Sequence, residues 1–150
     1  MRNRDLARDH IDRATIRLKA VDVLFEGRSW ADVVRESQEV VELALKGLLR
    51  ASGIEPPRMH DVSDVLLAER GALPTEVAPH VDRLVEASRA LRRDRELAFY
   101  GTADLTPSSF YKEADAVSAR DYARDVVRLV APAASKDGPG DSQEPLVQSD

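Results

Sequence analysis

The stretch LRRDRELAFYG, residues 91–101, gathers side chains that could do chemistry. Arg92 and Arg95 carry guanidinium groups, which stay charged and present a planar fork of donors suited to phosphate. Glu96 follows Arg95 directly, and Tyr100 comes little more than one helical turn later. These four residues form our candidate site for a phosphate group or a nucleotide.

The three histidines are the other candidates for chemistry. His60 and Asp61 stand where a short helix is expected to begin, so a capping or packing role competes there with a chemical one. His10 and His80 have no second metal ligand four residues away, and the chain contains no cysteine. We therefore expect no metal site and no bound cofactor.

Composition limits the classes of function. With 150 residues, of which 43% are hydrophobic, the chain is long enough for one buried core. A net charge of −5 does not fit a polycation that binds nucleic acid without specificity. The charged first ten residues do not resemble a secretory signal, and no stretch approaches the ~20 apolar residues of a membrane span. We expect a cytoplasmic protein that does not associate with membranes.

The elements that position these residues are predicted to be helices. Apolar residues recur at steps of three and four, which is the spacing of one helix face. The predicted helices cover residues 5–26, residues 30–51 with Ser29 as N-cap, a shorter segment that begins at His60 and stops at Gly71, a segment from Pro74, and a segment from about residue 112. No segment alternates with period two as a strand does. The prediction is an all-α fold, an up-and-down antiparallel bundle of four to five helices.

The chain divides into one domain and a tail. Residues 1–131 hold the whole helical pattern, and residues 132–150 are rich in Pro, Gly, Ser and acidic residues. Such a composition buries too little apolar surface to compensate for the entropy of ordering. We therefore expect a disordered acidic tail.

Three stretches of the chain resemble the HEPN family of small prokaryotic helical-bundle proteins. They are SQEVVELALKGLLRASGIEPPRMHDVSDVL at 37–66, RELAFYG at 95–101, and FYKEADAVSARDYARDVVRLV at 110–130. The resemblance covers roughly residues 5–130. It implies a dimer, and it also implies two functions found in the family, a metal-independent ribonuclease toxin and a partner of a small nucleotidyltransferase in a toxin–antitoxin pair.

The resemblance also assigns a role to Arg95. Catalytic members carry an arginine followed, after four to six residues, by a histidine that transfers protons. In this chain the three permitted positions hold Tyr100, Gly101 and Thr102. Tyrosine, with a reference pKa of about 10, is a poor general base at neutral pH. The phosphate-binding arginine is retained, whereas the catalytic histidine is missing.

Several interpretations stay open at the level of sequence. Arg95 lies on an apolar helix face, where it either binds phosphate or pairs with a carboxylate such as Glu36, Glu39 or Glu42. The protein is then a non-catalytic dimer that binds nucleotide, RNA or a partner protein. The alternatives are a ribonuclease in which His60 or Tyr100 replaces the missing histidine, and a structural interaction protein.

Overall fold

The computed structural model describes the backbone of residues 2–58, 62–99 and 107–135. Side chains are described in these ranges except at residues 2–3, 93–99, 107–108 and 135. The elements are α1 (Arg2–Glu26), α2 (Trp30–Ala51), α3 (Val62–Ala68), the 3-10 turns η1 (Arg70–Ala72) and η2 (Ala78–His80), α4 (Val81–Phe99), α5 (Pro107–Phe110) and α6 (Glu113–Ser135). The described ranges contain no strand. The predicted all-α fold is confirmed.

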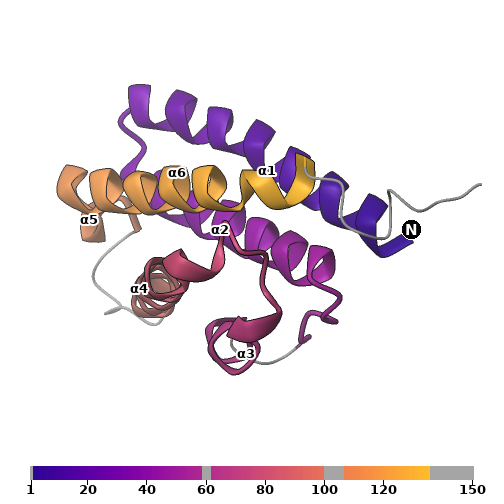
Figure 1. Cartoon of the computed structure of the whole chain (residues 1–150). Helices are drawn as coiled ribbons and strands as arrows, with labels where there is room; N and C mark the ends of the chain where they lie inside the picture. The colour runs from indigo at the N-terminus through magenta and orange to yellow at the C-terminus, as the bar shows by residue number, and fades with distance from the viewer. Residues whose placement is uncertain (1, 59–61, 100–106, 136–150) are drawn as a thin grey trace, which may run out of the picture.

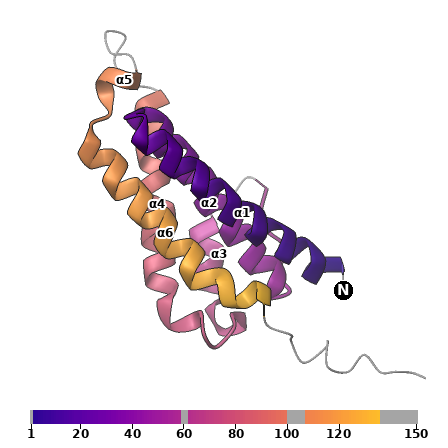
Figure 2. The ribbon, with the colours of Figure 1, turned by 90° about the horizontal axis from the view of Figure 1, so that it is seen from above.

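The long helices α1, α4 and α6 surround α2, which contacts all three (Figures 1 and 2). Polar contacts fix the direction of α1 relative to α6. Arg8, near the start of α1, donates to the carbonyl of Ala134 near the end of α6, and Arg124, in the middle of α6, pairs with Asp22 near the end of α1. The four long helices alternate in direction along the chain, as an up-and-down bundle requires.

The core is built around the apolar face of α2. The fully buried leucines Leu45, Leu48 and Leu49 lie on this helix. Gly47 lets α1 approach closely, since a Cβ atom built there would lie 2.7 Å from Cγ1 of Ile11 and 3.1 Å from the backbone oxygen of Ala7. The α1–α2 interface therefore depends on one residue having no side chain.

One helix start and one side-chain cap differ from the sequence prediction. The segment after Pro74 forms turns, and α4 begins only at Val81. Pro79 explains the delay, because proline lacks an N–H and disfavours helical geometry at the residue before it. Ser29 precedes α2 as predicted, but it makes no side-chain cap to the backbone, and its hydroxyl donates to Asp32 at 2.6 Å instead.

The last helix continues beyond the predicted end of the domain. α6 runs through Pro132 to Ser135, past residue 131, and Ala133 is buried. The proline is tolerated because it removes only one backbone hydrogen bond and the residue after it, Ala133, still packs against the bundle. Residues 136–150, the rest of the predicted tail, lie outside the described residues.

Candidate anion-binding site on α4

The candidate site belongs to α4, whose apolar face fixes the helix on the bundle. Val81, Leu84 and Leu91 are fully buried on this face. Their spacing of three and seven residues leaves Arg83, Arg89 and Arg92 outside the buried stripe. The apolar residues therefore set the path of α4, and this path determines where the arginines of the helix lie.

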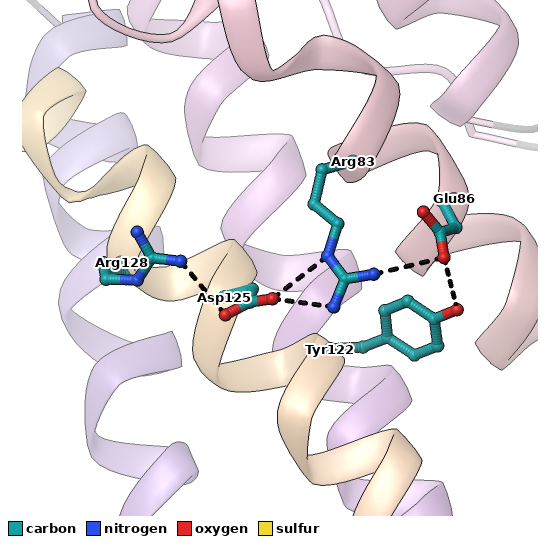
Figure 3. A network of polar contacts seen from close by, with 5 residues as sticks. All are labelled: Arg83, Glu86, Tyr122, Asp125 and Arg128. Atoms are coloured by element: carbon teal, nitrogen blue, oxygen red, sulfur yellow. Dashed lines mark hydrogen bonds and ion pairs between the residues drawn. The ribbon is translucent and has the colours of Figure 1, made fainter.

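The first turns of α4 are tied to α6 by a polar network (Figure 3). Arg83 donates from Nε and Nη2 to Oδ2 of Asp125, at 3.0 and 2.7 Å. Its Nη1 donates to Glu86 at 3.1 Å, and the hydroxyl of Tyr122 donates to the same Glu86 oxygen at 2.8 Å. Arg128 donates to the second oxygen of Asp125 at 3.1 Å. One guanidinium thus joins two carboxylates on two helices.

The electrostatics of this network favour the charged carboxylate. Burial alone would raise the pKa of Asp125, but the hydrogen bonds and charges of Arg83 and Arg128 lower it below its ordinary value. Burial and the hydrogen bond to Glu86 raise the pKa of Tyr122. The guanidinium of Arg83 also lies 4.5 Å from the centre of the Tyr122 ring, a cation–π distance.

The middle of α4 is tied to α3. Arg89 donates from Nε to the hydroxyl of the buried Ser63 and from Nη2 to Asp64, both at 3.0 Å. Since α3 begins at Val62, this contact holds against α4 the segment that follows the predicted pair His60 and Asp61. Those two residues themselves lie outside the described residues.

The predicted site residues fall at the far end of α4. Arg92 is half-buried on the helix. Arg95 and Glu96 lie within the helix bounds, but their side chains are outside the described set. Tyr100 lies beyond the described residues. The structure therefore places three of the four predicted residues within one turn or so of the same helix and leaves their mutual geometry a prediction.

Two of the carboxylates considered as partners of Arg95 have other partners. Glu36 accepts a 2.7 Å hydrogen bond from Arg17 of α1, and Glu42 accepts one of 3.0 Å from Gln38. The expected ion pair between Glu42 and Lys46 is present at 3.8 Å. The structure thus gives Glu36 and Glu42 roles within α2 and its contact with α1.

Sequence analysis missed the α4–α6 network. Its only local signal was the spacing of Arg83 with Glu86 and of Asp125 with Arg128, three residues apart in each pair, which is common on exposed helix faces. An open cleft of about 540 Å³ lies beside the network and is lined by Arg83, Ala114, Val117, Ser118, Asp121 and Tyr122. Pairing across 42 residues of sequence could not be read from that spacing.

The comparison with known families decides the identity of the domain. The model of the HEPN domain matches residues 7–134, which include all four long helices almost completely. The chain belongs to the HEPN family. Searches among curated proteins and among solved structures gave no match.

Two absences hold for the residues that the structure describes. No group of three metal-ligating side chains is present among them. None of the helices in the described ranges is both long enough and apolar enough to span a bilayer.

Proposed function

We propose that this HEPN protein is a non-catalytic, dimeric binding module that holds a phosphate group of a nucleotide or of RNA at Arg92 and Arg95. The observation that carries the proposal is the incomplete motif. Arg95 is present, and the positions that follow it after four to six intervening residues hold Tyr100, Gly101 and Thr102 in place of a histidine. Loss of a proton-transfer group removes a step of cleavage but leaves an anion site.

The contacts along α4 support the position of this site. Arg83 is bound to Asp125 and Glu86, and Arg89 is bound to Ser63 and Asp64, so their charges are balanced by neighbouring carboxylates. These arginines hold α4 against α6 and α3. The proposal assigns the anion to the later part of the helix because the incomplete motif lies there, where Arg92 and Arg95 follow Arg89 at steps of three residues.

The second subunit is expected to cover the same end of α4. Within one chain, the apolar face of α2 is already buried by α1, α4 and α6. Helices α2 and α4 carry the widest apolar faces, and the proposal places the dimer interface on α4, with Glu96 and Tyr100 near the shared site. We propose a cytoplasmic protein with a nucleotidyltransferase-type partner, and a tail at 136–150 that the domain does not need.

The test is a binding and cleavage assay with single-stranded RNA and with a nucleotide, in EDTA. Wild type, Arg95→Ala and Arg95→Lys are compared with Arg35→Ala, which removes the same charge from an exposed position of α2. We expect binding without cleavage in wild type and in the control. Arg95→Ala should weaken binding about tenfold or more, since a charged hydrogen bond is worth about 1.5–3 kcal/mol, and lysine should restore only part of it.

Two outcomes would overturn the proposal. Cleavage by wild type that disappears in Arg95→Ala would make the protein a ribonuclease with His60 or Tyr100 in the place of the missing histidine. Equal binding by wild type and Arg95→Ala, with equal thermal stability, would remove Arg95 from any site and leave the structural interaction protein.

A further inference from the structure

A second group of basic side chains lies on the α1–α2 face. His10 and Arg13 stand one turn apart on α1, and Lys46 and Arg50 stand one turn apart on α2. Gly47 lies between the two residues of α2, and a Cβ atom there would be 3.1 Å from Cβ of His10. The close approach of the helices therefore brings all four side chains to one interface, which we call the α1–α2 basic cluster.

Two cations of this cluster, Arg13 and Lys46, are held weakly by carboxylates. Arg13 meets Asp9 and Lys46 meets Glu42 at 3.8 Å, near the limit of an ion pair. Arg50 also meets Glu55 at 3.8 Å. The side chains of Asp9, Glu42 and Glu55 are 61%, 39% and 80% exposed. Exposed pairs of this kind contribute about 0–1 kcal/mol, so a ligand with two negative charges can compete with them.

The charges around His10 are positive on balance despite these carboxylates. Burial lowers the pKa of His10, and the positive charges of Arg50, Arg13 and Lys46 lower it further, with Asp9 as the opposing charge. Nδ1 of His10 is buried and has no hydrogen-bond partner among the described residues. Because Nδ1 is buried, His10 senses a bound anion through its charge and not through a hydrogen bond from this nitrogen.

We propose that His10, Arg13, Lys46 and Arg50 form a second anion site, which binds a phosphate group on the α1–α2 face. Figure 2 shows that the start of α1 and the end of α2 lie at the opposite end of the bundle from α5, beside which α4 ends. The site is therefore separate from the one proposed at Arg92 and Arg95. It rests on its own residues and stands whether or not that function holds.

Anion binding and protonation of His10 are linked at this site. A bound dianion offsets the three positive charges and favours the imidazolium, so it raises the pKa of His10. By reciprocity, the anion binds more tightly as the pH falls through the titration of His10. A general effect of salt would screen the same charges, which makes equal ionic strength an essential condition of the test.

The experiment follows the three histidines by NMR across a pH series, with the full chain in sodium chloride or in sodium sulfate at equal ionic strength. Sulfate serves as the probe because it keeps two charges throughout the series. His10→Gln assigns the resonance of His10. We expect sulfate to raise the pKa of His10.

A matched pair of variants locates the site. Arg13→Gln with Lys46→Gln removes two cluster charges, whereas Lys19→Gln with Arg35→Gln removes two exposed charges from the other end of the same helices. The sulfate effect should disappear in the first pair and persist in the second. Inorganic phosphate, measured by calorimetry, should bind the first pair at least about tenfold more weakly.

The outcomes separate this site from the one on α4. Arg95→Ala should leave the sulfate effect on His10 intact even if it abolishes binding at α4. An equal pKa of His10 in chloride and sulfate would overturn the second site. An equal loss of the sulfate effect in both double variants would also overturn it. A nucleoside monophosphate and an RNA without terminal phosphates, used in turn, then identify the source of the phosphate group.

Discussion

The contact of α1 with α2 and the contact of α4 with α6 are built by different means. The first relies on Gly47 and on buried aliphatic side chains such as Ile11, so its geometry depends on shape. The second is crossed by Arg83 and Asp125, which are 36% and 31% exposed, and its geometry depends on directed hydrogen bonds. One contact contributes stability through close packing, and the other fixes orientation.

This difference bears on how a helical bundle presents a site. Apolar packing fixes which face of α4 is buried, and directed hydrogen bonds further restrict the rotation of the helix. Two nitrogens of Arg83 donate to one oxygen of Asp125, and Arg89 donates to Asp64 of α3, so both contacts add to this restriction. The later turns, where Arg92 and Arg95 lie, then follow from the helix itself. The polar contacts thus position residues that they do not touch.

The largest effect is expected from filling the α1–α2 interface. Gly47→Leu places a side chain where Ile11 and the backbone of Ala7 already lie, and we expect a loss of about 3 kcal/mol in the free energy of unfolding, at the upper end of the range for overpacking. Urea denaturation measures it. Gly71→Leu is the control, because nothing lies within 4 Å of a Cβ atom there. Equal stability of the two variants would contradict the close approach of α1.

A smaller effect is expected from the α4–α6 contact. In a double-mutant cycle, Arg83→Ala and Asp125→Ala should show a coupling of about 0.5–1 kcal/mol, since the pair is bidentate but partly exposed. The cycle of Asp125 with Arg128, which is 68% exposed, should give about 0.3 kcal/mol. A coupling for Arg83 no larger than that for Arg128 would show that the network does not orient α4.

The smallest expected effect is a difference between the two contacts in how the free energy of unfolding depends on pH. The folded pKa of His10 lies below the ordinary value of 6.5, so the unfolded state binds more protons and stability decreases as the pH falls below 6.5. Asp125 is lowered from 3.8, so its contribution is lost only at more acidic pH. Between pH 6.5 and about pH 5, His10→Gln should flatten the pH dependence of unfolding, and Asp125→Asn should leave the dependence on pH unchanged. The reverse result would assign the acid response to α4 and α6.

Local patterns in the sequence predicted most of the fold. The predicted stripe of Ala116, Ala119 and Ala123 is buried in α6, and the end of α1 at Glu26 agrees with the glycine that follows it. Wrong predictions arose where two local signals competed. Pro74 suits a first helical turn, but Pro79 disfavours helix before it, and α4 begins only at Val81. The hydroxyl of Ser29 donates to Asp32 and makes no capping hydrogen bond with the backbone of α2.

The amino-acid sequence by itself determined the helices, the all-α class, the HEPN resemblance and the absence of a histidine after Arg95, because these depend on residues close together in the chain. The tertiary structure alone decided that Arg83 meets Asp125 and that Arg89 meets Asp64. It also decided that His10 lies among Arg13, Lys46 and Arg50. Such contacts join separate helices, and their energies depend on distance, burial and neighbouring charge, which a spacing along one helix does not contain.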